Sequence, residues 1–212
     1  MQAYKYDQND GKTHTRYTEL MQCSESGIER VLDQRFGRRK KGFSNNSTEF
    51  GKTRHDQFEV ESKKSSKLPE VFVKNIPELE LMNPTIDYAE HSFATELFPN
   101  VVIHFTIDSV ASASNIIFDY KTAINDDTQY FQSKQLTFYA MLLEPHGINI
   151  KTGMYLVEFW NKDYDEILGY SRVPKKIGLV QKAEVMSWAR KRVERLQVGI
   201  KYYKEELGLQ EI

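Results

Sequence analysis

The chain has very little cysteine, with Cys23 as its single thiol among 212 residues. One cysteine excludes a disulfide framework within the chain, and it excludes a zinc or iron–sulfur site built mainly from thiolates. Long apolar runs are also missing, because no stretch approaches the roughly 20 residues that a membrane helix needs. The N-terminal residues MQAYKYDQNDGKTH contain no apolar core of the kind found in a signal peptide. We therefore expect no membrane association and a cytoplasmic location, with Cys23 as a small buried residue near a helix.

A strong excess of either charge is absent as well, since the formal net charge is −1. The total therefore gives no electrostatic argument for a nucleic-acid partner, although a local patch can still be basic. Arg38, Arg39, Lys40 and Lys41 form such a run. It is interpreted either as a solvated loop or as a loop that contacts phosphates. The length and the ordinary share of apolar residues predict one globular domain over 1–212 with a buried core.

The spacing of apolar residues predicts an α/β domain with a central mixed sheet that contains an antiparallel meander and is flanked by helices. We expect helices at 16–35, 49–62, 129–144 and 181–207, and strands at 90–98, 101–111, 115–121, 152–160 and 166–172. Residues 37–48 are a loop by composition. The prolines in 63–85 leave open short strands or one short helix in that segment.

The two strands around Ala113-Ser114 predict a hairpin with two distinct faces. Taking these two residues as the loop places Asp108 opposite Asp119 and Val110 opposite Ile117. The apolar face then carries Ile103, Phe105, Ile107, Ile116, Phe118 and Tyr120, and the polar face carries His104, Thr106, Asp108, Asp119 and Lys121. A slip by one residue would exchange the two faces, so the pattern specifies the register.

Two carboxylates directly opposite one another on a sheet have β-carbons roughly 4.5–5.5 Å apart, and the like charges repel. A divalent cation bound by Asp108 and Asp119 would remove that repulsion, since Mg²⁺ prefers oxygen ligands. Lys121 lies on the same face, where its ammonium can stabilise negative charge that develops on a phosphate. These are the parts of metal-assisted phosphodiester hydrolysis. The alternative is a solvent-facing sheet surface with scattered charges.

The order of these residues resembles the PD-(D/E)XK nuclease superfamily, and in particular its RecB-type branch. Asp108 precedes the D-x-K motif Asp119-Tyr120-Lys121. Gly51-Lys52-Thr53-Arg54-His55 matches G-x-x-x-H, and Gln135-Leu136-Thr137-Phe138-Tyr139 matches Q-x-x-x-Y. Glu90 stands where such proteins often have a glutamate on the first strand. Each motif alone is unspecific, but together they occur in the order of that branch.

The resemblance implies a restriction-endonuclease-like core over about 50–160 and specific roles for the matched residues. His55, Asp108, Asp119 and the backbone carbonyl of Tyr120 would hold Mg²⁺ or Mn²⁺, and Lys121 would be the catalytic lysine. Gln135 and Tyr139 share one helix face at i and i+4, and they would orient the substrate or Lys121. Without the motifs, His55 would be read as a structural histidine and Tyr139 as a core aromatic.

Other residues have less definite assignments. Glu90 is either an acid that supports the metal ligands or an exposed strand residue. Arg54 and the basic run at 38–41 are candidates for DNA contacts. Relatives often have a glycine shortly before the hairpin aspartate, whereas this chain has Phe105-Thr106-Ile107-Asp108, which puts the shape of the substrate channel in question. With one cysteine, the chain cannot carry the iron–sulfur cluster of some RecB-type exonucleases.

The function implied is a metal-dependent deoxyribonuclease, and first of all an exonuclease in phage or bacterial DNA processing, recombination or repair. It would act on single strands or duplex ends in the cytoplasm of a bacterium or a phage-infected cell. No P-loop segment is present, so a helicase or recombination protein would be a separate partner. The alternatives are an endonuclease of the same superfamily, a DNA-binding module that has the nuclease fold without activity, and an unrelated α/β domain.

Overall fold

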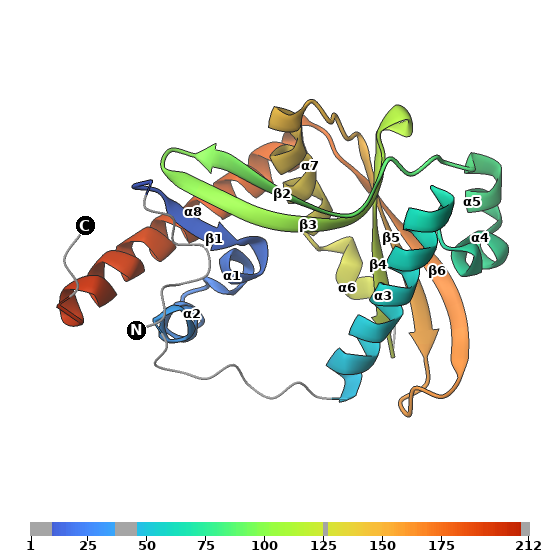
Figure 1. Cartoon of the computed structure of the whole chain (residues 1–212), viewed down its shortest axis with the longest axis horizontal. Coiled ribbons are helices and arrows are strands. Elements are labelled where there is room, and N and C mark those ends of the chain that lie inside the picture. The colour runs from blue at the N-terminus through green and yellow to red at the C-terminus, as the bar shows by residue number, and fades with distance from the viewer. Residues whose placement is uncertain (1–9, 37–45, 125–126, 209–212) are drawn as a thin grey trace. The chain divides into compact units, whose positions relative to one another are not determined.

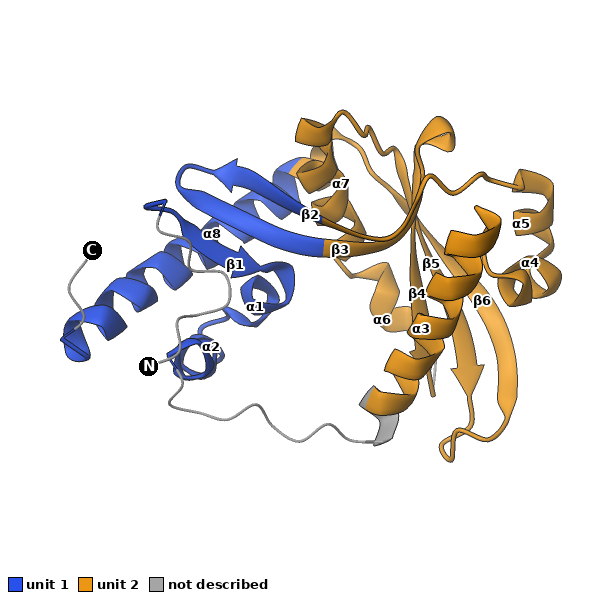
Figure 2. Cartoon of the chain, in the orientation of Figure 1, with its two compact units in different colours: residues 1–43, 93–105, 183–212 blue, residues 44–92, 106–182 orange. Residues whose placement is uncertain are grey.

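A computed structural model describes residues 10–36, 46–124 and 127–208 (Figure 1). The chain forms two compact units, which are coloured separately in Figure 2. Unit 1 contains residues 1–43, 93–105 and 183–212, and unit 2 contains residues 44–92 and 106–182. The motif core expected from the sequence falls mainly in unit 2. The assignment of the whole chain to one domain stays a prediction.

Unit 2 is built on a mixed sheet, as expected from the alternation of apolar residues. Its strands are the last part of β3 (Val101–Ala111), then β4 (Ile116–Ala123), β5 (Thr152–Trp160) and β6 (Ile167–Lys176). β3 and β4 pair antiparallel, β4 and β5 pair parallel, and β5 and β6 pair antiparallel. The parallel pair needs a crossover connection, and the helical segment after β4 supplies it.

The hairpin register agrees with the prediction, although its loop is longer. Val110 pairs with Ile117, and the ladder continues to Ala111–Ile116 at one end and Ser109–Phe118 at the other. The connection is a turn of 3₁₀ helix, Ser112–Ser114, followed by Asn115 with φ +56°. Asparagine tolerates this left-handed conformation better than most residues, so the turn closes without a glycine. The predicted two-residue loop was therefore wrong, while the pairing it implied was right.

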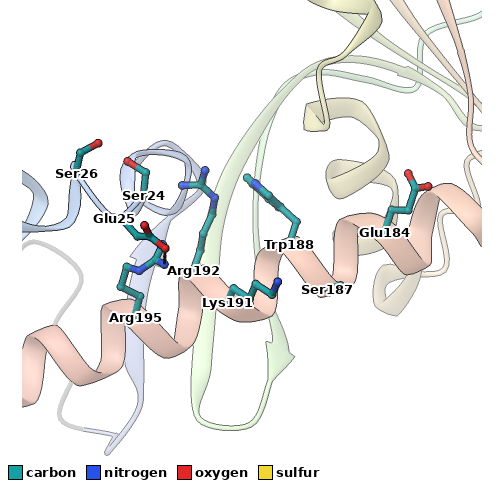
Figure 3. A pocket seen from close by; sticks show the side chains of 9 residues that line it. All are labelled: Ser24, Glu25, Ser26, Glu184, Ser187, Trp188, Lys191, Arg192 and Arg195. Carbon is teal, nitrogen blue, oxygen red and sulfur yellow. Dashed lines mark hydrogen bonds and ion pairs between the residues drawn. The ribbon is translucent and has the colours of Figure 1, made fainter.

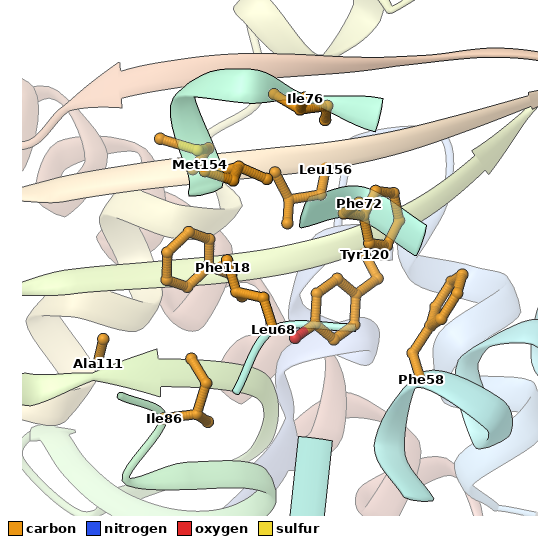
Figure 4. Packing of buried hydrophobic residues seen from close by; sticks show 11 residues of the cluster. Phe58, Leu68, Phe72, Ile76, Ile86, Ala111, Phe118, Tyr120, Met154 and Leu156 are labelled. Atoms are coloured by element: carbon orange, nitrogen blue, oxygen red, sulfur yellow. The ribbon is translucent and has the colours of Figure 1, made fainter. Parts of the chain in front are cut away.

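One face of the unit 2 sheet is covered by three helices: α3 (Asn46–Ser65), α4 (Glu70–Asn75) and α5 (Pro77–Met82). The segment that had suggested short strands or one short helix thus forms two helices separated at Ile76. Figure 4 shows the core that they make with the sheet. Its largest side chains are Phe58, Phe72, Phe118 and Tyr120, all at most 2% exposed. The Phe72 and Tyr120 rings stack with centroids 5.6 Å apart.

The other face of the sheet carries α7 (Gln135–Leu143), whose Leu136 packs on Gly153 of β5. A β-carbon at position 153 would lie 2.8 Å from that of Leu136, so only glycine permits this approach. The expected helix at 129–144 is interrupted, because α6 (Thr128–Phe131) ends before Ser133, whose hydroxyl accepts the backbone N–H of Gln135. A serine that bonds its own backbone competes with helix continuation.

Unit 1 contains β1 (Thr13–Arg16), which the sequence did not predict, paired parallel with residues 101–104 of β3. The hairpin partner of β3, β2 (Tyr88–Phe98), and the long helix α8 (Leu179–Glu206) each extend into this unit. The helix expected at 16–35 is two helices, α1 (Tyr17–Gln22) and α2 (Ile28–Arg35). They are separated at Gly27, where a β-carbon would lie 2.3 Å from the carbonyl oxygen of Gln22.

Cys23, which directly follows α1, and buried residues of α2 and α8 form a second apolar cluster within unit 1. Its members include Cys23, Val31, Leu32, Leu196 and Ile200. Cys23 is fully buried beside α1, as predicted, and its thiol donates to the carbonyl of Glu19. Within the described ranges, no helix combines the length and apolar character needed to cross a bilayer.

Candidate metal and catalytic site

The site begins where β3 leaves β4. The paired register ends at Ser109–Phe118, one pair short of the predicted facing of Asp108 and Asp119. The backbone N–H of Tyr120 instead donates to Oδ2 of Asp108 at 2.6 Å. The carbonyl of Tyr120 lies 2.6 Å from Nε2 of His55, which comes from α3. The N–H and the C=O of one strand residue point to the same neighbour, so these two side chains replace the missing strand partner.

His55, Glu90 and Asp108 form a compact group of potential ligands. One donor atom from each lies within 4.8 Å of the others. Nδ1 of His55 is 3.5 Å from Oε1 of Glu90, and its Nε2 is 3.8 Å from Oδ2 of Asp108. Glu90 has a φ of +44° although it lies in strand β2. Such backbone strain costs on the order of 1–3 kcal/mol and is concentrated at functional sites.

Asp119 and Lys121 form the second half of the site, on the face of the sheet that α7 covers. Nζ of Lys121 lies 2.5 Å from Oδ2 of Asp119. The other carboxylate oxygen of Asp119 accepts a hydrogen bond from Nε2 of Gln135 at 2.8 Å. The same amide nitrogen is 3.4 Å from the hydroxyl of Tyr139, one helical turn further along α7. The i, i+4 spacing of Gln135 and Tyr139 therefore places both near Asp119.

The part of the predicted polar face that carries Asp108 and Asp119 is buried, whereas Thr106 on the same face is exposed. Asp108 is 9% exposed and Asp119 is 2% exposed, because α7 packs over this end of the sheet. The scattered-charge alternative does not describe such a surface. Buried charges need partners, and these two carboxylates are placed beside His55 and Lys121.

The pKa of Asp108 is raised from 3.8 to about 7. Burial is the largest cause, and the negative charge of the nearby Asp119 carboxylate is the second. Burial lowers the pKa of His55, but its hydrogen bond to Glu90 and the charge of Asp108 outweigh burial and raise the pKa to about 9. Burial also opposes the charged form of Lys121, while Asp119 and Asp108 more than offset it and raise its pKa. The negative charges of the carboxylates are thus balanced by His55 and Lys121, whose raised pKa values favour their positively charged forms.

The donor set fits a divalent metal ion. Besides the group of His55, Glu90 and Asp108, it offers Oδ2 of Asp119, which is buried. Among the described residues this oxygen has no hydrogen bond of acceptable geometry, although Nζ of Lys121 is close. Carboxylate oxygens, one imidazole and a backbone carbonyl make a mixed oxygen and nitrogen set, which suits Mg²⁺ or Mn²⁺ better than a thiolate-seeking ion.

The predicted site residues of unit 2 therefore meet in one place, with the exception of Arg54. Nε and Nη2 of Arg54 donate to the two carboxylate oxygens of Glu158, at 2.8 and 2.6 Å. The Glu158 carboxylate is fully buried and also accepts the indole N–H of Trp160. Arg54 is thus part of a structural ion pair with Glu158, and it is not among the DNA contacts proposed below. The basic run at 38–41 lies outside the described residues.

Replacing Arg54 by alanine is expected to lower the free energy of unfolding by about 3 kcal/mol, because it leaves a buried carboxylate without its cation. Urea unfolding monitored by circular dichroism would measure this. Lys74→Ala is the matched control, because the Lys74–Glu70 pair is more than two-thirds solvent-exposed on both sides. An exposed pair of this kind contributes about 0–1 kcal/mol. Equal losses in the two variants would show that the Arg54–Glu158 pair does not stabilise the fold.

Sequence reasoning did not single out the residues that support the site. Tyr155 lies beside Asp119 in the β4–β5 register and is fully buried, and its hydroxyl donates to Ser133 at 2.6 Å. The sequence predicts Tyr120 as a core residue whose backbone carbonyl is a metal ligand. The structure shows in addition that its hydroxyl is hydrogen-bonded to Ser62 and Ser109 inside the core. A buried tyrosine needs such partners, but their identity depends on contacts distant in sequence.

Unit 1 contains a separate surface hollow of about 660 Å³, drawn in Figure 3. It is lined by the loop after α1 and by α8, and the arginines Arg192 and Arg195 lie in it. Arg192 donates to the carbonyl of Met21 and lies over the Trp188 ring, and Arg195 donates to the carbonyl of Cys23. Cations that bind carbonyls at a helix end stabilise that end. The hollow contains none of the predicted catalytic residues.

No protein-family model matches the sequence, and no curated protein matches it either. Solved structures do show the same fold. A putative exonuclease from Eubacterium rectale superposes with a TM-score of 0.60 at 12% identity, over 100% of this chain and 88% of that chain. LHK-Exo, an alkaline exonuclease from Laribacter hongkongensis, gives 0.52 at 11% identity in its complex with dAMP, over 94% and 95%.

A phage-related exonuclease from Haemophilus somnus 129PT superposes with a TM-score of 0.51 at 11% identity, over 92% of this chain and 97% of that chain. At these identities the likeness establishes the fold. The chain has the fold of these exonucleases, over nearly the whole length of each. A fold hosts many activities, so the function has to be argued from the site.

Proposed function

We propose that the protein is a metal-dependent deoxyribonuclease that hydrolyses DNA phosphodiester bonds. The observation that carries the proposal is the meeting of His55, Glu90 and Asp108 beside the Asp119–Lys121 pair. Three carboxylates and two cationic side chains converge at one end of a sheet, where a purely structural core would place apolar residues. That end belongs to a fold shared with exonucleases.

In this proposal His55, Asp108, Asp119 and the carbonyl of Tyr120 hold Mg²⁺ or Mn²⁺, and Glu90 joins them as a further acidic ligand. When bound, such an ion polarises the phosphate and lowers the pKa of a water molecule. Nε2 of His55 donates to the Tyr120 carbonyl, so binding of an ion by both groups would require His55 to release this proton to solvent. The N–H of Tyr120 holds Asp108 in place through the bond to its Oδ2.

Lys121 is the catalytic cation in this proposal. Its ammonium lies beside Asp119 and is within reach of a phosphate bound at the carboxylates, where it stabilises the negative charge of the transition state. Gln135 orients Asp119 by donating to the carboxylate oxygen that Lys121 does not contact. Tyr139 is a positioning residue, because its hydroxyl lies beside the Gln135 amide at the buried start of α7.

We further propose that DNA is the substrate and that the chain acts as an exonuclease of the RecB type in phage or bacterial DNA processing, recombination or repair. The structural neighbours are exonucleases, and LHK-Exo has been solved in complex with dAMP, which supports this choice. A single domain, a cytoplasmic location and a separate helicase or recombination partner belong to the same proposal. The four motifs in their RecB-type order are its support in the sequence.

Digestion of end-labelled linear DNA and of closed circular DNA, single- and double-stranded, tests the proposal. We expect degradation of linear DNA with Mg²⁺ or Mn²⁺ and no degradation with EDTA. Activity that survives EDTA would refute the metal role. Cutting of closed circles would replace the exonuclease by an endonuclease, and binding without cutting would leave a DNA-binding module with the nuclease fold.

The metal-induced rise in melting temperature is expected to be larger at about pH 8.5 than at about pH 6. The pKa of His55 is raised from 6.5 to about 9 in the folded protein, so protonated His55 stabilises the metal-free fold. This stabilisation is complete below about pH 6.5 and is lost as the pH rises through about 9. The pKa of Asp108 is also raised in the folded protein, because burial favours its neutral, protonated form. The stabilisation of the fold by this form is lost as the pH rises from about 4 through about 7. Differential scanning fluorimetry with Mn²⁺ and with EDTA measures the difference, and a rise independent of pH would contradict this site.

A further inference from the structure

A row of aromatic side chains leads away from the catalytic pair. Tyr155 is the register partner of Asp119, so the two share one face of the sheet. The ring of Tyr130, on α6, stacks on Tyr155 with centroids 5.2 Å apart. Ser133 accepts the hydroxyl of Tyr155 immediately after α6. These contacts hold α6 directly beside Asp119, and the charges of Asp119 and Lys121 both act on the Tyr130 hydroxyl.

Phe131, which follows Tyr130 in the chain, is 56% exposed although it is a large apolar side chain. Lys175 on β6 donates an ammonium N–H to the backbone carbonyl of Phe131. Lys134 follows Phe131 in the chain and directly precedes Gln135 at the start of α7. Lys175 also lies on the face of the sheet that carries Asp119. Residues 117, 153 and 175 are register partners across β4, β5 and β6, and residue 117 is two positions before Asp119 on β4, so their side chains point to the same face.

The two ammonium groups lie close enough to affect one another. Burial lowers the pKa of Lys175, and the positive charge of Lys134 lowers it further. Like charges held together are unfavourable, and an anion that contacts both would relieve the repulsion. A single exposed aromatic residue needs no explanation by itself. Here the backbone carbonyl of the same residue is bound by Lys175, which lies on the face of the sheet that carries Asp119. Exposed aromatic rings near cationic side chains are the features that bind unpaired nucleotides.

We propose that Phe131, Lys134 and Lys175 form a subsite for single-stranded DNA beside the catalytic residues. The ring of Phe131 stacks on one unpaired base, and the two lysines contact the phosphates that flank it. The assignment rests on the proposed function for its biological meaning, but binding at this subsite does not depend on cleavage. A paired base offers no free face for such stacking, so the subsite favours single strands over blunt duplexes.

Fluorescence anisotropy with a labelled 15-nucleotide oligo(dT), in EDTA so that nothing is cut, tests the subsite. Phe131→Ala is expected to weaken binding by roughly five- to tenfold, and Phe131→Trp is expected to retain it. Replacing both lysines by glutamine should reduce the slope of log affinity against log salt by about 1.4, because each phosphate contact contributes about 0.7. Phe131→Ala should leave that slope unchanged.

Matched controls lie on α4 and α5, which cover the opposite face of the sheet. Leu81→Ala removes an apolar side chain that is 88% exposed, and Lys74→Gln removes an exposed ammonium. Equal oligo(dT) affinities for the Phe131→Ala and Leu81→Ala proteins would overturn the subsite, as would an equal effect of Phe131→Ala on a blunt hairpin duplex. Melting temperatures verify that each variant is folded.

A parallel cleavage assay with Mn²⁺ separates this proposal from the proposed function. Binding that depends on Phe131 and the lysines, with no cleavage by the wild type, would refute the nuclease and support the subsite. Cleavage by the wild type, with oligo(dT) affinity and salt slope unchanged in all subsite variants, would overturn the subsite and leave the nuclease in place.

Discussion

Replacing Asp119 by alanine is expected to reduce DNA cleavage by roughly a thousandfold or more and to remove most of the metal-induced rise in melting temperature. Oδ2 of Asp119 is buried, lies beside Lys121 and has no well-formed hydrogen bond among the described residues. The other oxygen is already bound by Gln135. The carboxylate is therefore held in one orientation, and the proposed ion loses a ligand that no neighbouring side chain can replace.

The measurement pairs a fluorescent DNA digestion assay with scanning fluorimetry in Mn²⁺ and in EDTA. Asp163→Ala is the matched control, since it removes an exposed aspartate in the loop between β5 and β6. We expect that control to keep wild-type rates and the wild-type metal effect. An Asp119→Ala protein that is folded and still cuts DNA at the wild-type rate would exclude this carboxylate from the chemistry.

Lys121→Met is expected to reduce cleavage by roughly a hundred- to a thousandfold while keeping the metal-induced rise in melting temperature. The ammonium lies at the Asp119 carboxylate, where it offsets negative charge in the metal-free protein. Methionine preserves most of the apolar length of the side chain and removes the charge. The acids then have one competing cation fewer, so the protein should bind Mn²⁺ at least as tightly as the wild type.

The contrast between the two variants is the sharper test. Asp119→Ala should lose both metal binding and cleavage, whereas Lys121→Met should lose cleavage alone. A Lys121→Met protein with wild-type turnover would remove the lysine from the catalytic step. One that no longer responds to Mn²⁺ would instead assign Lys121 a structural role in holding Asp119. Lys63→Met, which alters an exposed ion pair on α3, is the control for charge removal.

Local patterns predicted much of the fold correctly. Alternating apolar residues located β3, β4 and β5 closely, and they specified the register of the hairpin, because a shift by one residue exchanges every side chain between the faces. Helix spacing located α3 and α8. Two failures occurred where a serine or a glycine interrupts a helix, at Ser133 and Gly27, since a local side-chain or backbone hydrogen bond made there outweighs intrinsic propensity.

The candidate site was predicted in its members more completely than in its geometry. Asp108, Asp119 and Lys121 follow from the hairpin register, and His55, Gln135 and Tyr139 follow from the resemblance in motif order. The structure places these residues near one another. The sequence allows two interpretations of Glu90, and the structure places its carboxylate beside His55. Arg54 was expected to contact DNA, whereas its guanidinium is bound to Glu158 on a strand about a hundred residues later.

By itself, the sequence determined which side chains share a face and a helical turn, because the periods of strands and helices are properties of the local backbone. It therefore specified the pairing of β3 with β4 and the common face of Gln135 and Tyr139. Only the tertiary structure decided that α7 packs over Asp119 and that the pairing of β3 with β4 ends before Asp108. It also decided that the side chains of Asp108 and of His55 from α3 bind the backbone of Tyr120 in place of a paired strand. These contacts join segments far apart in the chain, and their selection depends on how complete helices pack on the sheet rather than on any local pattern.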